Sequence, residues 1–302
     1  MPAAFRAEAP TWAALTICYA LYAALSLAAA SLPFGVGYVG LAIVIAFHSS
    51  LQHETIHGHP TRWPLLNEAL VFPPLGLAFP YRRYRQTHLS HHLDACLTDP
   101  YDDPESWYLD PAAWERRPRW MKALLMVNNA ALGRMLIGPA LSILRFFSSE
   151  FRRIVSGDLV VMKAWALHLA GLLMVAAWLA HAGTSPLGYV LSAYGGLALI
   201  NLRSFLEHRA EERVRGRSAI VEDRGLLSFI YLNNNLHAVH HAHPETPWSA
   251  LPALYRSKRD WFLAVNGGYV FHSYGEVLSR HAFRPKEPPA HPLMPAPDRP
   301  PE

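Results

Sequence analysis

Long apolar runs without a single charged residue occur in two pairs, and this pattern constrains the fold more than any other feature. The runs cover residues 12–32 and 34–51, linked at Pro33, and residues 164–182 and 186–202, linked by residues 183–185. Each run is about long enough to cross the ~30 Å hydrocarbon core of a bilayer as a helix. Because so few residues separate the members of each pair, we expect two helical hairpins. The sequence therefore predicts an all-α integral membrane protein with four transmembrane helices.

Basic residues are distributed unevenly around these runs. Segments 52–163 and 203–302 hold 26 of the 27 Lys and Arg residues, Arg6 precedes the first run, and both short links have none. Since basic residues are enriched on the cytoplasmic side of membrane proteins, we expect both termini and both large polar segments in the cytoplasm. The preference for Arg over Lys and the Ala-rich runs favour a bacterial inner membrane. The N-terminus is not typical of a cleaved signal peptide.

Two further apolar stretches are interrupted by charged residues. Residues 64–80 contain Glu68, and residues 123–147 contain Arg134. We expect both stretches to form helices that lie on the cytoplasmic membrane interface. A full crossing by either stretch would place the histidine-rich segments on opposite sides of the membrane.

The domain organisation follows from these assignments. We expect residues 1–282 to form one membrane domain, with a cytoplasmic helical cap built from residues 52–163 and 203–282. The remaining residues, 283–302, are rich in proline and are expected to be disordered.

Histidine is the residue type that indicates chemistry, because the chain has 17 histidines against 2 cysteines. Three clusters are present: HETIH at residues 53–57, HLSHH at residues 88–92 and HAVHH at residues 237–241. On a helix, residues three and four positions apart share a face, so each cluster can direct two or three ring nitrogens at one metal centre. All three clusters lie in the segments predicted to be cytoplasmic. With no CxxC motif present, we predict a metal site built from imidazoles alone.

A ninth histidine, His208, lies just beyond the fourth apolar run, at the membrane depth expected for the clusters. The candidate metal ligands are therefore His53, His57, His88, His91, His92, His208, His237, His240 and His241. Nine imidazoles exceed the four ligands of a tetrahedral zinc site. They suit two metal ions of higher coordination number, and iron accepts nitrogen ligands while keeping positions open for oxygen.

Further polar residues near the clusters are candidates for orienting metal-bound histidines. These candidates are Glu54, Glu207, Asp94, Asp99, Asp102, Asp103, His59 and His243. For each carboxylate, an ordinary surface or helix-capping role is an equally good interpretation. His48 is about 140° around a helix from His53, so we expect it to be packed or hydrogen bonded. His168 and His181 fall within the third run and are expected to lie away from the site.

The three clusters, in this order and separated by paired apolar runs, resemble the histidine boxes of the membrane fatty acid desaturase superfamily. The resemblance covers roughly residues 35–282, and the stretches 97–106, 233–237, 266–269 and 274–277 are similar to bacterial members. The resemblance implies a non-haem di-iron centre bound by the eight box histidines, with His208 matching an additional histidine near the last span. Some members carry Asn one turn before that histidine, where this chain has Ser204.

The resemblance also implies a reaction. Dioxygen would be the co-substrate for oxidation of an unactivated C–H bond in a lipid chain, with desaturation of a fatty acyl group as the first choice. The same ligands would serve a hydroxylase, ketolase or epoxidase acting on an alkyl, carotenoid or sterol-like lipid. A membrane zinc protease fits less well, because it matches only the H-E-x-x-H of the first cluster. A metal transporter also fits less well, because its ligands would be placed near mid-membrane.

The expected partners follow from the same features. The sequence has no cytochrome or ferredoxin domain, no CxxC cluster and no GxGxxG fingerprint, so electrons would come from a separate protein. The Arg-rich cytoplasmic segments suit an acidic donor such as a ferredoxin. In a membrane protein the net charge of +4 is better explained by topology than by nucleic-acid binding. We therefore expect a lipid or acyl substrate from the membrane and no nucleic-acid partner.

Overall fold

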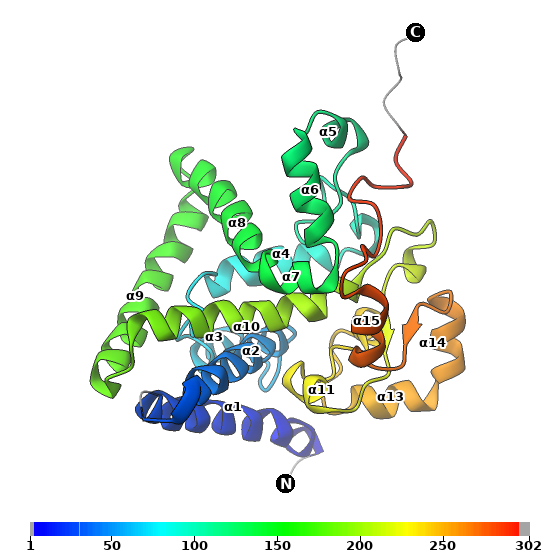
Figure 1. Ribbon diagram of the computed structural model, residues 1–302. Coiled ribbons are helices and arrows are strands. Elements are labelled where there is room, and N and C mark those ends of the chain that lie inside the picture. Colours follow the sequence, from blue (N-terminus) through cyan, green and yellow to red (C-terminus); the bar gives the residue numbers. More distant parts are fainter. Residues whose placement is uncertain (1–2, 30, 296–302) are drawn as a thin grey trace.

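The computed structural model describes residues 3–29 and 31–295, and the side chains of residues 3–7, 34 and 94 lie outside the described part. The chain is mostly helical, with two strands of two residues each among the described residues, so the predicted all-α class is confirmed. The four longest helices are α1 (Ala3–Ala28), α2 (Val36–Ile56), α9 (Leu159–Ala182) and α10 (Pro186–Glu207). Figure 1 shows α1, α2 and α10 side by side, with α9 on the left of the view.

Three helices are long and apolar enough to cross a membrane: Glu8–Ala28 within α1, then α2 and α9. Helix α10 has a similar length, but its sequence mixes Gly, Ser, Tyr and Asn with the apolar residues and ends in Arg203 and Glu207. The structure thus supports three of the four predicted spans, and the fourth stays a prediction.

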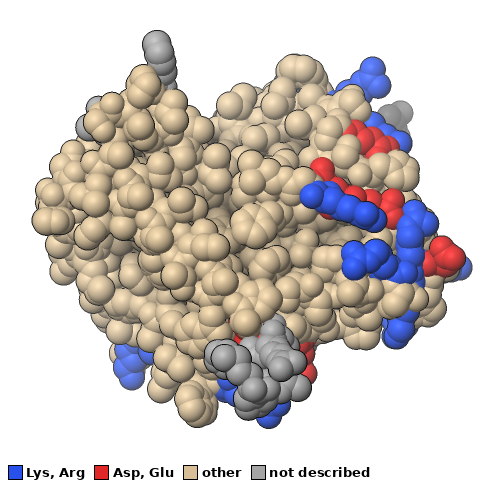
Figure 2. All heavy atoms as spheres, turned by 90° about the horizontal axis from the view of Figure 1, so that it is seen from below, with Lys and Arg blue, Asp and Glu red and all other residues tan. Residues whose placement is uncertain are grey.

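Apolar side chains cover the outer surface of these helices. Exposed examples on α9 and α10 are Leu169, Leu173, Met174, Leu187, Val190 and Leu191. Figure 2 shows the molecule from below, and most of this face is free of charged side chains, which gather at the right-hand end. An apolar surface of this extent is typical of a protein in contact with a membrane.

Helices α2 and α10 pack closely because glycine faces the contact. A Cβ atom at Gly196 would lie 2.8 Å from Ile45 Cγ2 and 3.0 Å from the carbonyl oxygen of Ala42. Small residues at such a contact allow two membrane helices to approach each other. The contact also brings the ends of both helices, and the histidines that follow them, to the same part of the molecule (Figure 1).

Helix α9 begins earlier than the apolar run predicts. The Asp158 side chain accepts hydrogen bonds from the backbone N–H groups of Val160 and Val161, at 3.0 and 3.2 Å. This is a standard N-cap, and it starts the helix at Leu159 instead of residue 164. The uncharged run excluded Lys163, although a lysine near a helix end can extend its ammonium toward water.

Shorter elements form a cap around the ends of α2 and α10. Its helices are α3 (Pro64–Leu70), α4 (Tyr81–His91), α5 (Pro111–Glu115), α6 (Arg119–Asn128), α7 (Ala131–Leu136), α8 (Gly138–Val155), α11 (Leu226–Ile230), α12 (His237–Ala242), α13 (Leu251–Ser257), α14 (Arg259–Val265) and α15 (Tyr274–His281). Short 3₁₀ turns occur at Pro33–Gly35, Asp94–Cys96 and Val214–Gly216. Strands β1 (Ile220–Val221) and β2 (Val270–Phe271) pair in parallel, with Ile220 opposite Val270.

The two stretches predicted as interfacial helices are more broken than expected. Helix α3 ends at Leu70, so the prediction of a helix is wrong for residues 71–80, where Pro73 and Pro74 prevent helix continuation. Residues 123–147 are divided among α6, α7 and α8. Helix α8 exposes Leu144, Phe147, Phe151 and Val155, an apolar stripe at helical spacing that is typical of an interfacial helix.

A buried ion pair joins the cap helices α4 and α8. The Arg83 guanidinium donates from Nε and Nη2 to the two carboxylate oxygens of Glu150, each at 2.8 Å. Both side chains are almost fully buried, at 3% and 2% exposure. Trp165 Nε1 on α9 donates to the same carboxylate at 3.0 Å. This pair therefore ties the helix that carries the second histidine cluster to α8 and α9.

The segment after α15 differs from the expectation of a disordered tail. The backbone N–H of Lys286 donates to the carbonyl oxygen of Asn129 at 2.9 Å. The backbone N–H of Leu109 donates to the carbonyl oxygen of Pro289 at 2.8 Å. Residues 283–295 thus pack along the cap, because a proline-rich chain still offers carbonyl oxygens as acceptors. Residues 296–302 lie outside the described part of the chain.

Candidate metal centre

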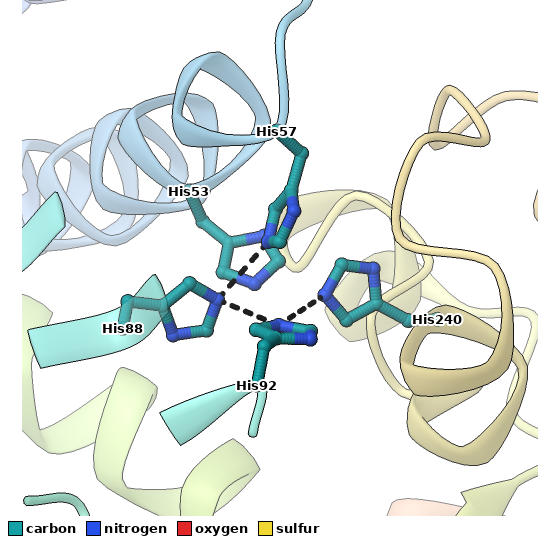
Figure 3. A group of neighbouring side chains, drawn as sticks. All are labelled: His53, His57, His88, His92 and His240. Carbon is teal, nitrogen blue, oxygen red and sulfur yellow. Dashed lines mark hydrogen bonds between the residues drawn. The ribbon is translucent and has the colours of Figure 1, made fainter. Parts of the chain in front are cut away.

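Five histidines from three separate elements point at one another in the first of two groups (Figure 3). His53 is in the last turn of α2 and His57 directly follows that helix, while His88 and His92 stand at the end of α4 and His240 is in α12. One ring nitrogen from each histidine lies within 4.8 Å of those of the others. Helices α2 and α4 contribute pairs four residues apart, as the shared-face argument predicts.

Four histidines form the second group: His91 from α4, His208 directly after α10, and His237 and His241 from α12. Their candidate ligand atoms also lie within 4.8 Å of one another. The rings of His92 and His241 stack at a centroid distance of 4.2 Å, so the two groups are neighbours. All nine histidines proposed from the sequence as metal ligands are brought together, as five and four.

The division of each HxxHH cluster follows from helical geometry. Residues i and i+4 are about 40° apart around a helix, whereas residue i+3 is about 100° from residue i+4. His88 and His92 accordingly face the first group while His91 faces the second, and His237 and His241 face the second group while His240 faces the first. One helical turn thus supplies ligands to two adjacent positions.

The spacing of the ring nitrogens fits metal coordination. In the first group, Nε2 of His88 lies 3.1 Å from Nε2 of His57 and 3.0 Å from Nε2 of His92. In the second, Nε2 of His208 lies 2.9 Å from Nε2 of His91 and 3.0 Å from Nε2 of His237. Two nitrogens that bind one metal at about 2.1 Å and at right angles are about 3.0 Å apart.

If the rings of His91 and His237 are neutral, as metal ligands are, hydrogen bonds alone do not satisfy these contacts. His91 Nδ1 donates to Asp103 Oδ1 at 2.8 Å, and His237 Nδ1 donates to Asn234 Oδ1 at 3.1 Å. In a neutral imidazole, each remaining Nε2 then carries a lone pair. Both lone pairs face the single Nε2 of His208, which can donate to only one of them. A shared cation satisfies all three nitrogens.

The first group contains a buried ring nitrogen without a hydrogen-bond partner in the described part of the chain. His88 Nδ1 donates to Glu105 Oε1 at 2.9 Å, so its Nε2 is an acceptor facing two other histidines. His53 Nε2 is buried and makes no hydrogen bond with any described residue. A buried polar atom without a partner costs free energy, and a metal ion at this position removes that cost. The donor set therefore fits one metal in each group.

Burial keeps most of these imidazoles neutral, as metal ligands must be. Burial, reinforced by the neighbouring His88, lowers the pKa of His57 to about 2. Burial and nearby histidines also hold the pKa values of His92, His237 and His240 well below the usual range. His91 differs: burial acts to lower its pKa, but the carboxylates of Glu105 and Asp103 outweigh burial and raise it to about 9. The same carboxylates would stabilise positive charge from a metal at its Nε2.

A cavity of about 500 Å³, within the range typical of ligand sites, reaches Glu105 and Glu207, the carboxylates that lie against His88 and His237. Glu105 and Glu207 line it near the two groups, while Ile45, Ala193 and Gly196 line it between α2 and α10. Apolar side chains from the cap, including Leu77, Phe79 and Phe146, line it together with charged ones, including Arg83, Arg145 and Glu150. The cavity therefore extends from the candidate metal centre toward the long apolar helices.

A sequence model of the fatty acid desaturase family matches residues 29–274, which is most of the chain. The chain belongs to this family. A search of curated proteins finds no match. Family membership is consistent with a membrane-associated oxidoreductase, and it gives the two histidine groups their context.

Not every residue proposed to orient a histidine does so in this desaturase-family chain. Glu54 Oε1 accepts a hydrogen bond from the backbone N–H of Trp248 at 3.0 Å, and His59 Nδ1 pairs with Glu8 at 2.8 Å. The ring of His243 lies against that of Phe262. Each of the three therefore has a partner away from the ligand nitrogens, and no contact of the described residues gives it the predicted role. The side chain of Asp94 lies outside the described residues.

Glu207 is placed as predicted and Glu105 was missed. Glu207 Oε1 lies 3.5 Å from Nδ1 of His237 and 2.7 Å from Nε of Arg203. Glu105 was not among the candidates, although the neighbouring Asp103 was. The sequence offers a weak signal, because both carboxylates stand in the short polar segment after the second histidine cluster. Only the fold places each of them against a histidine.

Proposed function

We propose that this protein is a membrane enzyme that binds two iron ions and uses dioxygen to oxidise an unactivated C–H bond in a lipid chain, most simply by desaturating a fatty acyl group. The observation that carries the proposal is the pair of adjacent histidine groups, whose acceptor nitrogens converge beside the 500 Å³ cavity. When bound, the irons would supply the oxygen-activating redox chemistry that protein side chains lack.

The residues of the chain have distinct tasks in this proposal. The box histidines and His208 hold the metals, and Glu105, Asp103 and Asn234 fix three of these rings by accepting from Nδ1. The cavity excludes water and aligns an extended lipid chain, since alignment decides which C–H bond is presented. The apolar part of its lining, which includes Ile45, Leu197 and Ile200, suits a hydrocarbon chain.

Desaturation and hydroxylation would use the same metal ligands, so the site does not favour one over the other. We propose desaturation because it is the activity for which the family is named. The two are separated by products. We expect membrane lipids of cells that express the protein to contain acyl chains two mass units lighter than those of control cells, measured by mass spectrometry. Purified protein should hold about two irons per chain. Chains sixteen units heavier would favour the hydroxylase, and a single zinc without iron would contradict the proposal in either form.

We also propose four transmembrane helices, with both termini and the cap in the cytoplasm, in a bacterial inner membrane. Support comes from the uncharged links between paired helices and from the basic residues of the cap. Residues 1–282 would form the single membrane domain.

Topology has a direct test in exposed serines of the two links, Ser31 and Ser185. In a Cys96→Ala background, Ser31→Cys and Ser185→Cys should react with a membrane-impermeant thiol reagent added outside the cell, because the remaining Cys18 is buried. Arg256→Cys on the cap is the matched control and should react only after the membrane is opened. The reverse pattern would overturn the proposed orientation.

A separate electron donor completes the proposal. Forming a double bond releases two electrons, while reduction of dioxygen to two waters takes four, so two electrons and two protons must be supplied. His57 and His92 line a solvent-open hollow of about 310 Å³ together with two arginines, Arg62 and Arg85, and one carboxylate, Glu245. No described carboxylate forms an ion pair with either arginine. An acidic donor protein would meet complementary charge there.

A further inference from the structure

The segment that follows the family match runs across the second histidine group. The match ends at residue 274, helix α15 continues to His281, and the chain then passes over the cap. Residues 282–291, which we call the strap, have fixed partners on three separate parts of the molecule. The family match thus ends before the strap.

The first attachment is at the junction between α6 and α7. The N–H of Lys286 donates to the carbonyl oxygen of Asn129 at 2.9 Å, and the Asn129 side chain donates in return to the carbonyl oxygen of Glu287. The second attachment is at Leu109, which forms a parallel bridge with Ala290. The N–H of Leu109 donates to the carbonyl oxygen of Pro289, and the carbonyl oxygen of Leu109 accepts from the N–H of His291. Both distances are 2.8 Å.

The third attachment reaches the histidine group itself. Lys286 Nζ donates to the backbone carbonyl oxygen of His208. An amine can donate to a carbonyl whether or not it carries its extra proton, so this contact does not depend on its charge. Lys286 and the prolines that follow it also line a small cavity of about 70 Å³, which His91 and His208 line as well. The strap is therefore one wall of the space beside the second group.

His208 differs from the other eight histidines, which lie in a helix or directly after one with near-helical backbone angles; its own backbone forms an antiparallel bridge with Ser218. His208 directly follows the last residue of α10, and its backbone is extended, with φ −132° and ψ 147°. Its ring is held by Ser218 Oγ, which lies 3.2 Å from Nδ1, while its backbone carbonyl is held by Lys286. Because the histidine is outside a helix, the direction of its ring depends on these contacts.

We propose that the strap closes the four-histidine group to solvent and that Lys286 is a positioning residue for His208, acting through the backbone. This inference rests on the proposed metal centre. It predicts that the two metals differ in how firmly they are held when the strap is altered. Loss of a group that orients a metal ligand typically costs 10- to 100-fold in metal affinity.

The test follows iron release from detergent-purified, full-length protein to the chelator ferrozine under reducing conditions. Lys286→Met removes the donor at similar length, and we expect half of the iron to leave about 10-fold faster while the other half leaves at the wild-type rate. Lys286→Arg, which keeps N–H donors, should restore slow release. Lys258→Met, at an exposed lysine of the cap, is the matched control and should match the wild type.

Two results would overturn the inference: wild-type release from Lys286→Met, or equal acceleration of both halves, which indicates general loosening. If Lys286→Met does not accumulate, Asn129→Ala weakens the strap from its other attachment and should release the same half. Wild-type protein without bound iron would contradict the proposed function instead. In that case the protein is treated with diethyl pyrocarbonate, and mass spectrometry measures the rate at which His208 is modified. This rate should be higher in Lys286→Met than in the wild type, and equal rates would overturn the proposed role of the strap.

Discussion

His88→Ala and His237→Ala are each expected to lower lipid oxidation by more than about 100-fold, because loss of a metal ligand should exceed the 10- to 100-fold effect of losing a group that only orients one. The two residues belong to different groups, so each variant should lose about one iron while keeping the other. Product formation by mass spectrometry and iron per chain are the two measurements. Neighbouring water cannot replace the lost nitrogen, since His88 and His237 are buried and their Nδ1 partners orient only the imidazole.

His181→Ala is the matched control for this prediction. His181 is exposed near the end of α9, and its ring lies against Trp178, so turnover and iron content should stay near wild type. His208→Ala should behave like the box variants, because Nε2 of His208 lies within 3.0 Å of two other candidate ligands. Normal activity with two irons in that variant would reduce the ligand set to eight.

Glu150→Ala is expected to destabilise the fold by about 3–5 kcal/mol, the usual cost of leaving one member of a buried ion pair without its partner. Arg83 would keep its charge at 3% exposure after losing both carboxylate contacts, and Trp165 would lose an acceptor. The measurement is thermal unfolding of the purified protein in detergent. A fall in melting temperature is expected even if iron binding is unchanged in the folded fraction.

Two comparisons make the Glu150 result specific. Arg83→Met combined with Glu150→Met removes both charges and should cost less than Glu150→Ala alone. Glu115→Ala removes the carboxylate of a surface ion pair with Lys122, in which the Glu115 side chain is 66% exposed. This change should alter the free energy of unfolding by less than about 0.5 kcal/mol. A melting temperature equal to the wild type in Glu150→Ala would show that the pair is not needed for stability.

Local periodicity in the sequence was enough to predict the long helices and the histidines of the three clusters that face one another. An uncharged run of about twenty residues strongly favours a long apolar helix, and α1, α2 and α9 are such helices. Likewise, the spacing in HETIH, HLSHH and HAVHH sets ring directions one turn apart, and all nine proposed histidines meet in the structure. His48 is hydrogen bonded, as expected: its ring nitrogen Nε2 lies 3.2 Å from the hydroxyl oxygen of Tyr19.

Contacts between distant segments depend on the tertiary fold and could not be predicted in this way. The fold gives His88 and His91 the carboxylates of Glu105 and Asp103, and it turns Glu54 and His59 toward Trp248 and Glu8. It also fastens the proline-rich strap to His208. The cause is the same in each case: a carboxylate or a carbonyl oxygen can accept from any donor that packing brings within reach, and the sequence does not encode that proximity locally.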